Sequence, residues 1–186
     1  MIRVFDFTAA LVGLVFLSPL FLVLLVIVWC DNRAPLFFQE RVGYQKKPFI
    51  LIKFRTMSVG TEVVATHLVD PASVSKLGSF LRKSKLDELP QLWNVFCGDM
   101  SFVGPRPSLY SQEDVIKERE ALGIYNSRPG ITGLAQIRGI DMSSPQLLAK
   151  TEYEMLQTLN ARRYLNYIYS TILGRGRGDK VRSRRH

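Results

Sequence analysis

The sequence predicts an α+β fold that is mostly helical, in which a membrane-associated N-terminal segment precedes one small domain. A run of 24 uncharged residues, Phe7–Cys30, is long enough to be a membrane helix. Two extended, aromatic and β-branched runs flank a turn-like stretch, and helical patterns dominate the remainder of the chain. The length of 186 residues accommodates one domain with an appendage rather than two independent cores.

Composition and charge narrow the class of protein. With 47% hydrophobic residues the chain is too apolar to be disordered, and its two cysteines and unperiodic glycines exclude a disulfide scaffold and collagen. The first 30 residues have no net charge, whereas 174–186 contains six Arg or Lys and one Asp, a net charge of +5. This distribution favours a membrane surface over nucleic acid, because nucleic-acid binding requires a basic face in the folded part as well.

The apolar run either spans the bilayer or only dips into it. Ser18 and Pro19 lie at its midpoint, and proline kinks or breaks a helix because it lacks the N–H and clashes with the preceding turn. Each half has 12 residues, about 18 Å of helix, whereas the hydrocarbon core is about 30 Å thick. A sharp kink would return the chain to its starting side, with the Ser18 hydroxyl bonded to a freed backbone group. Because proline is tolerated within membrane-spanning helices, however, physical arguments alone slightly favour a kinked spanning helix.

After the apolar run, the sequence predicts a β-hairpin and two helices. Residues 35–41 and 49–55 are extended runs on either side of a turn at 42–48. Residues 58–75 are irregular, and 76–83 forms a short helix. An amphipathic helix comes next and ends at Gly98, because apolar residues recur at helical spacing at Leu89, Leu92, Trp93 and Phe96.

The second half predicts three further helices around a loop. Ser111 caps a polar helix that runs to about Leu122, and a glycine-punctuated loop covers 128–140. Pro145 lies in the first turn of the next helix, where its missing N–H costs nothing. The stretch 162–173 is aromatic, basic and amphipathic, which fits an interfacial helix on anionic lipid. A terminal helix that faces the core, with a solvated tail after it, is an equally good interpretation.

The residue types present argue against several common sites. Cys30 and Cys97 are isolated, so neither a zinc site nor a disulfide is expected. The two histidines, His67 and His186, are too few for a histidine-based catalytic site. The glycines of the basic tail lack the strand–helix context of a nucleotide-binding fingerprint.

Asp87 and Glu88 are the first candidates for chemistry. Pro90 must lie in the first turn of the amphipathic helix, so both carboxylates lie at or just before its N-terminus, where the helix dipole favours their charged forms. Ionised carboxylates suit a nucleophile and a ligand for a hard cation such as Mg²⁺, and they do not suit a general acid of raised pKa. The simpler interpretation, favoured by the local sequence alone, is an Asp cap with a favourable Glu charge in the first turn.

Basic residues elsewhere supply the opposite charge. Pro105 and Pro107 hold Arg106 in a rigid, extended conformation that suits bidentate contact with phosphate oxygens, although a solvated arginine in a rigid turn fits equally well. Lys53 and Arg55 add positive charge at the end of the hairpin, and the glycines of the 128–136 loop allow a ligand close to the backbone. Two carboxylates, several cations and a membrane anchor are the components of phosphoryl transfer to or from a lipid.

Five motifs in this order resemble the bacterial sugar transferases, and more narrowly the small monotopic phosphoglycosyl transferases. They are Lys53-Phe54-Arg55-Thr56-Met57, Leu86-Asp87-Glu88-Leu89-Pro90-Gln91, Gly98-Asp99-Met100-Ser101, Gly104-Pro105-Arg106-Pro107 and Arg128-Pro129-Gly130-Ile131-Thr132-Gly133. The match covers about residues 1–173. It implies a re-entrant membrane helix in 1–30, broken at Ser18-Pro19, which reverses the preference for a spanning one. A catalytic domain in 31–173 and a basic tail in 174–186 complete the expected organisation.

The resemblance also implies a two-step, ping-pong reaction. Asp87 would attack the β-phosphorus of a UDP-sugar and release UMP, and the phosphate of undecaprenyl phosphate or another polyprenol phosphate would then take the phosphosugar from the aspartate. Glu88 would hold Mg²⁺ against the diphosphate. The remaining expected contacts are Arg106, Lys53 and Arg55 to phosphate oxygens, and Arg128, Thr132 and Gln136 to the nucleotide or sugar.

Such an enzyme is expected on the cytoplasmic face of the bacterial inner membrane, with membrane lipids around it and no nucleic-acid partner. An N-acetylated amino or diamino sugar is the first expectation for the donor, and hexoses stay open. Many relatives carry Asp near the position of Glu152, so the role of this glutamate stays open, as does the oligomeric state. The rivals are a non-catalytic membrane scaffold in which Asp87 and Glu88 only cap a helix, and a polytopic transferase, which needs many spans.

Overall fold

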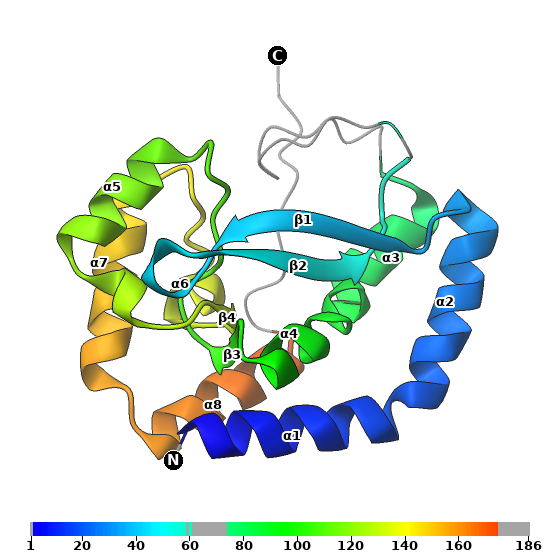
Figure 1. Ribbon diagram of the computed structural model, residues 1–186, viewed down its shortest axis with the longest axis horizontal. Helices are drawn as coiled ribbons and strands as arrows, with labels where there is room; N and C mark the ends of the chain where they lie inside the picture. Colours follow the sequence, from blue (N-terminus) through cyan, green and yellow to red (C-terminus); the bar gives the residue numbers. More distant parts are fainter. Residues whose placement is uncertain (1, 59, 61–73, 175–186) are drawn as a thin grey trace.

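A computed structural model describes residues 2–58, 60 and 74–174, and the described chain is a mostly helical α+β structure, as predicted. Two long helices, α1 (Ile2–Phe16) and α2 (Ser18–Asn32), run along two sides of the molecule, and the other elements lie in the angle between them (Figure 1). Apart from Gly174, the predicted basic tail lies outside the described residues, as do His67 and most of the predicted irregular segment.

The predicted helix break lies at the junction of α1 and α2, which meet at an angle of 64°. Pro19 is in the first turn of α2, and the Ser18 hydroxyl donates a 2.7 Å hydrogen bond to the carbonyl of Val15. This bond satisfies a backbone group that the break frees, as predicted. In the described part of the chain, no one helix has the length and apolarity to cross a bilayer. The bent pair meets both criteria when its two helices are counted together.

The predicted hairpin consists of β1 (Leu36–Val42) and β2 (Pro48–Phe54), within one residue of the predicted bounds. The strands are antiparallel, in register from Leu36 opposite Phe54 to Val42 opposite Pro48. A short 3₁₀ turn, η1 (Tyr44–Lys46), connects them. The hairpin runs across the molecule from the end of α2 towards α5 (Figure 1).

The helices expected after the hairpin are present. Helix α3 (Lys76–Ser84) begins where the Ser75 hydroxyl accepts the N–H of Gly78 at 2.9 Å, a side-chain N-cap. A 3₁₀ turn, η4 (Leu86–Glu88), leads into α4 (Gln91–Cys97). Helix α4 ends as predicted at Gly98, whose φ of 96° is a left-handed conformation that glycine adopts freely.

The later helices are α5 (Glu113–Ala121), η5 (Ile124–Asn126), α7 (Pro145–Thr158) and α8 (Ala161–Ile172). Pro145 lies in the first turn of α7, as predicted. The predicted Ser111 cap is wrong, because Gln112 occupies the N-cap position of α5 and no side chain caps this helix. Its acidic first turn, Glu113 and Asp114, interacts favourably with the helix dipole instead.

The stretch 128–140 is more ordered than the predicted loop. It contains β4 (Gly130–Thr132) and α6 (Leu134–Ile137), and β4 pairs in parallel with β3 (Ser101–Val103). A Cβ atom at Gly130 would lie 2.0 Å from the backbone nitrogen of Gly104, so the pairing requires glycine there. A three-residue strand leaves no periodic signal, because distant pairing rather than local propensity creates it.

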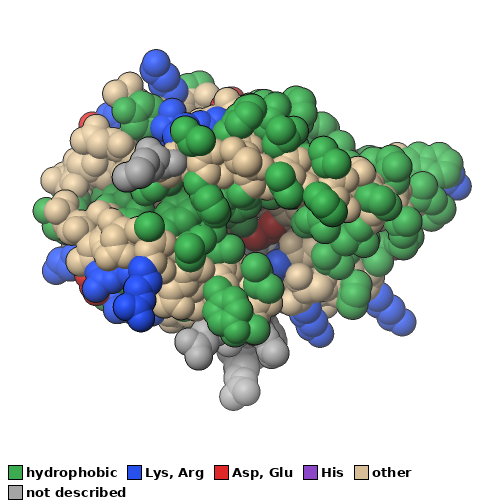
Figure 2. All heavy atoms as spheres, turned by 90° about the horizontal axis from the view of Figure 1, so that it is seen from below, with side chains coloured by type: hydrophobic (Ala, Val, Ile, Leu, Met, Phe, Trp, Pro, Cys, Tyr) green, Lys and Arg blue, Asp and Glu red, His purple; other side chains and the backbone are tan. Residues whose placement is uncertain are grey.

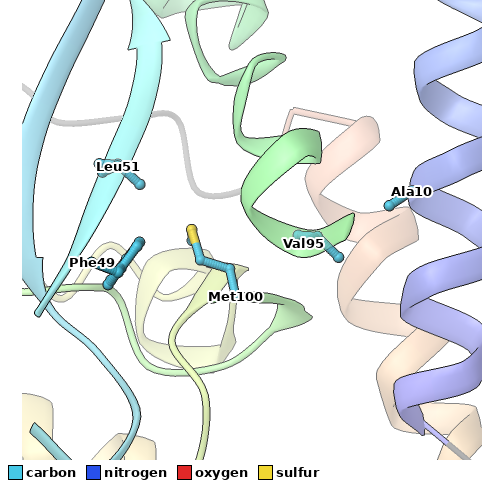
Figure 3. Close-up of a cluster of buried hydrophobic side chains, with 5 residues drawn as sticks. All are labelled: Ala10, Phe49, Leu51, Val95 and Met100. Carbon is cyan, nitrogen blue, oxygen red and sulfur yellow. The ribbon is translucent and has the colours of Figure 1, made fainter. Parts of the chain in front are cut away.

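The two helices of the bent pair, α1 and α2, pack against different parts of the domain. Ala10 of α1 belongs to a buried cluster with Phe49, Leu51, Val95 and Met100, so α1 lies on α4 and faces the hairpin (Figure 3). Leu24 and Val28 of α2 belong to a second cluster, together with Phe54 and Leu81. The domain core is therefore completed by residues on both sides of the helix break.

Helix α8 has one side that faces the core and one exposed apolar side, so it has features of both interpretations, the core-facing helix and the interfacial helix. Tyr164 is buried, whereas Leu165, Tyr169 and Ile172 are exposed. Exposed apolar side chains are also numerous on α1, and α1 and α8 lie along the same edge of the molecule (Figure 1). The surface seen from that edge is largely hydrophobic, with a few acidic atoms in a central hollow (Figure 2).

Candidate active site

Asp87 and Glu88 lie in the tight turn η4 between helices α3 and α4. The turn forms because Lys85, just after α3, has left-handed backbone angles of φ 58° and ψ 16°, which reverse the chain direction. Leu86 and Leu89 fix the turn by packing against the cluster beneath α2. Pro90 occupies the N-cap position of α4, and no side chain caps that helix. The interpretation of Asp87 as a helix cap is therefore wrong.

Asp87 is buried, with 8% of its surface exposed. Burial, and second the adjacent Glu88, raise the pKa of Asp87 to about 7, against the opposing effect of Lys53, Arg82 and Arg106. The prediction that the helix dipole keeps the pKa of Asp87 low is therefore wrong. Dehydration and a neighbouring carboxylate outweigh the dipole of a seven-residue helix. The site thus holds a carboxylate that changes charge near neutral pH and that a bound cation would stabilise as the anion.

Cations from three other elements surround this carboxylate. Lys53 of β2, Arg82 of α3 and Arg106 of the segment after β3 all lower its pKa. A guanidinium nitrogen of Arg106, Nη1, lies 3.8 Å from Oε1 of Glu88. The structure therefore brings together four of the predicted residues: both carboxylates, Lys53 and Arg106.

Arg55 has a different environment from the one predicted. Its Nε donates to the carbonyl of Ala34 at 3.0 Å and its Nη2 to that of Leu36 at 3.2 Å, while the guanidinium stacks on Phe37. These contacts hold the start of β1 in place. They give Arg55 a structural role, and phosphate binding by this residue has no support from its geometry.

Arg82 is a residue of the site that the sequence did not reveal. It lies in the last turn of α3, where its Nε donates to the Thr56 hydroxyl at 2.8 Å. Its Nη1 is buried without a hydrogen-bond partner among the described residues. The available signal is the basic cluster Arg82, Lys83 and Lys85 directly before the carboxylates, and this cluster does not distinguish a site residue from a solvent-exposed one.

Glu152, whose role the sequence left open, bonds to the backbone of the Arg106 segment, residues 104–107. Its Oε1 accepts the backbone N–H of Arg106 at 3.2 Å and Nη2 of Arg119 at 2.6 Å, and its Oε2 accepts Nε of Arg119 at 2.8 Å. Both side chains of this ion pair are almost completely buried. Burial raises the pKa of Glu152, and the Arg119 guanidinium counteracts the shift. Glu152 is thus a positioning residue for Arg106.

The pairing of β3 with β4, together with Arg41, also fixes the Arg106 segment. Gly104 donates its N–H to Thr132 at 2.9 Å, Gly130 donates to Pro105 at 2.8 Å, and Nη1 of Arg41 donates to the Pro107 carbonyl at 3.1 Å. The segment is therefore anchored at both ends, and the two prolines restrict its backbone between the anchors.

The three predicted nucleotide or sugar contacts have mainly structural partners. Thr132 is buried and shares a hydrogen bond with Thr171, and Nε2 of Gln136 donates to the carbonyl of Gly104 at 3.5 Å. Arg128 donates to the carbonyl of Gly98 at 2.8 Å and lies over the ring of Tyr44. Their nucleotide and sugar roles stay predictions.

The donor set fits Mg²⁺ only in part. Among the described residues no group of three His, Cys, Asp or Glu side chains is arranged to hold a metal ion. Mg²⁺, however, commonly binds one or two carboxylates together with substrate phosphates and water. Asp87 and Glu88 would supply that pair, because they are adjacent in the turn η4.

Comparison with known proteins agrees with the motifs. The family model described as "Bacterial sugar transferase" matches residues 1–175. The uncharacterised sugar transferase EpsL of Bacillus subtilis is 42% identical over 74% of this chain and 68% of its own length. A UDP-glucose:undecaprenyl-phosphate glucose-1-phosphate transferase of Caulobacter vibrioides is 36% identical over 91% and 67%, and the exopolysaccharide production protein ExoY of Rhizobium meliloti 39% identical over 91% and 83%. The chain therefore belongs to the bacterial sugar transferase family, as its motifs predict, and is an enzyme of the phosphoglycosyl transferase type.

Proposed function

We propose that this protein transfers a sugar 1-phosphate from a UDP-sugar to undecaprenyl phosphate, with release of UMP, by a ping-pong mechanism through Asp87. The observation that carries the proposal is a buried aspartate beside Glu88, surrounded by Lys53, Arg82 and Arg106. The Caulobacter relative is named as a UDP-glucose:undecaprenyl-phosphate glucose-1-phosphate transferase, which supports the same class of transfer here.

In the first step, the Asp87 carboxylate attacks the β-phosphorus of the donor. A bond forms between its oxygen and the β-phosphorus, while the bond from that phosphorus to the bridging oxygen breaks and UMP leaves with the electron pair. In the second step, a phosphate oxygen of undecaprenyl phosphate attacks the same phosphorus and the carboxylate leaves. Because little covalent work falls to the protein, positioning and charge stabilisation carry the catalysis.

The cations have distinct parts in this mechanism. Lys53 and Arg82 favour the ionised, nucleophilic form of Asp87, because both lower its pKa. Arg106, fixed by Glu152 and the strand pairing, presents its guanidinium to the phosphate oxygens. Glu88, with Asp87, would hold Mg²⁺, which supplies positive charge against the diphosphate.

The membrane arrangement is inferred from the bent helix pair. We propose that α1 and α2 form a re-entrant hairpin, with both ends on the cytoplasmic face of the bacterial inner membrane. The 64° bend and the exposed apolar side chains of both helices support this arrangement. The exposed apolar side of α8 would lie in the interface, so that the site meets the lipid phosphate at headgroup level.

The test is UMP release by the full chain in lipid nanodiscs, with Mg²⁺, undecaprenyl phosphate and a panel of UDP-sugars that includes hexoses and N-acetylated sugars. Asp87→Asn should abolish release, whereas Asp114→Asn, a matched change on the exposed side of α5, should leave it unchanged. Radiolabel from the sugar phosphate should remain on the native protein when the lipid acceptor is omitted.

Two outcomes would contradict the proposal. Turnover that survives in Asp87→Asn excludes the covalent mechanism. A native protein that is folded and lipid-embedded yet releases no UMP from any donor favours the non-catalytic scaffold.

A further inference from the structure

Lys85 has an unusual backbone conformation for a lysine. Its φ of 58° lies in the left-handed region, which glycine adopts freely and side chains with a Cβ disfavour. The position comes directly after α3, where helices commonly end on a left-handed glycine. A lysine that occupies a glycine position is strained, and strain of this kind concentrates at functional sites.

Lys85 lies two residues before Asp87, next to the candidate site. It is half-buried, whereas Lys83, two residues earlier, is exposed. The charged groups that act on it are Glu88 first, then Arg106 and Asp87. Arg106 itself lies against Glu88, so Lys85 and Arg106, which come from separate elements, both interact electrostatically with this carboxylate.

The charges around the carboxylates are unequal. Two carboxylates face Lys53, Arg82, Lys85 and Arg106, so positive groups outnumber negative ones among the described residues that interact electrostatically at the site. Lys85 and Arg106 repel each other. An anion with charge on several oxygens relieves that repulsion, and a diphosphate is such an anion.

We propose that Lys85 is a phosphate-binding residue of this enzyme, which contacts the diphosphate of the donor on the Glu88 side together with Arg106. The proposal deepens the proposed function and rests on it for the identity of the donor. It assigns the strained turn a purpose: the left-handed conformation directs the ammonium to the substrate and simultaneously starts the turn that carries Asp87 and Glu88.

The experiment measures equilibrium binding of UDP with Mg²⁺ to the full chain in nanodiscs. UDP contains the diphosphate that all UDP-sugars share, so the unknown sugar does not matter. The variants are Lys85→Gly, Lys85→Ala and Lys85→Arg, with Lys83→Ala as the control for a lysine of the same segment. Thermal unfolding of each variant is recorded in parallel.

Lys85→Gly is the informative variant, because it removes the ammonium and also relieves the backbone strain. Its melting temperature should not fall below that of the native protein, while its Kd for UDP should rise tenfold or more, on the order of the loss of one charge-assisted phosphate contact. Lys85→Ala should lose affinity equally and be less stable than Lys85→Gly. Lys85→Arg should retain most of the affinity, and Lys83→Ala all of it.

An unchanged Kd in Lys85→Gly would overturn the proposal, and so would a loss confined to Lys85→Ala, because backbone strain would then explain it. Failure of the native protein to bind millimolar UDP would overturn it as well. UMP release by the native protein is measured separately. A native protein that binds UDP through Lys85 but releases no UMP refutes the transferase mechanism and leaves the phosphate contact established.

Discussion

The hydroxyl of Tyr164 on α8 donates a hydrogen bond to the carboxylate of Asp6 on α1, and so joins the two helices through residues 158 positions apart in the sequence. The same hydroxyl lies 2.9 Å from the Ser101 hydroxyl and 3.4 Å from the backbone nitrogen of Val103. Asp6 also accepts the N–H of Phe102 at 3.5 Å. The free edge of β3 is therefore closed by two side chains, and β3 leads directly into the Arg106 segment.

Removal of this hydroxyl should destabilise the protein. Tyr164→Phe leaves the buried Asp6 carboxylate without its main donor, which costs about 1–3 kcal/mol of unfolding free energy. Tyr169→Phe, a matched change on the exposed side of α8, should have no measurable effect. Unfolding of both variants in the same detergent, monitored by circular dichroism, gives the comparison. Equal stability of the two would show that the Asp6–Tyr164 bond contributes nothing.

Stability should depend on pH through Asp87. Its pKa in the folded state, about 7, is above the unfolded value of about 3.9, so between these pH values the folded state binds the extra proton. Stability therefore decreases as the pH rises through 7. In EDTA at pH 8, Asp87→Asn should be more stable than the native protein by up to roughly 4 kcal/mol, and the difference should disappear near pH 4. Denaturant titrations at the two pH values measure it. A difference that is the same at both would contradict the raised pKa.

The buried pair of Glu152 and Arg119 allows stability to be separated from activity. Glu152→Gln should lower the unfolding free energy by about 3 kcal/mol, because it leaves the Arg119 charge buried without its counter-ion. The double variant Glu152→Leu with Arg119→Leu should recover most of that loss. It should still release UMP at least tenfold more slowly, because the backbone N–H of Arg106 has lost its acceptor. Full recovery of turnover in the double variant would exclude a positioning role for Glu152.

The helix break makes a topological prediction that a native cysteine can report. Cys30 is exposed near the end of α2, and Cys97 can be replaced by Ser. In a re-entrant hairpin, Cys30 and a cysteine introduced at Val4 should both react with a membrane-impermeant maleimide in inverted vesicles, and neither should react in intact spheroplasts. Reaction from opposite sides would show that the helix pair spans the membrane.

Local patterns in the sequence were sufficient to predict much of the fold. The extended, aromatic and β-branched runs around 42–48 predicted the hairpin within one residue. The helical spacing that begins at Leu89 predicted α4 and its end at Gly98. The proline at position 19 located the bend. Each of these elements is determined by side chains or backbone restrictions within a few residues of it.

The predictions that were missed or wrong depend on distant contacts. The pKa of Asp87 is set by burial beneath other elements, which overrides the dipole argument. Strand β4 exists through its pairing with β3, and Arg82 reaches the site only because α3 packs beside β2. Glu152 is joined to Arg106 across 46 residues of chain. No periodicity or local motif encodes such relationships.

The packing of the bent helix pair, α1 and α2, has a consequence for how this enzyme can be handled. Ala10 completes the cluster that includes Val95 and Met100, and Val28 completes the one that includes Phe54 and Leu81. A shortened chain that begins after residue 30, intended as a water-soluble version, would expose two open hydrophobic surfaces directly behind the elements that carry Asp87 and Lys53. The bent helix pair and the catalytic elements are thus a single folding unit, so truncation is not a route to a soluble, folded enzyme.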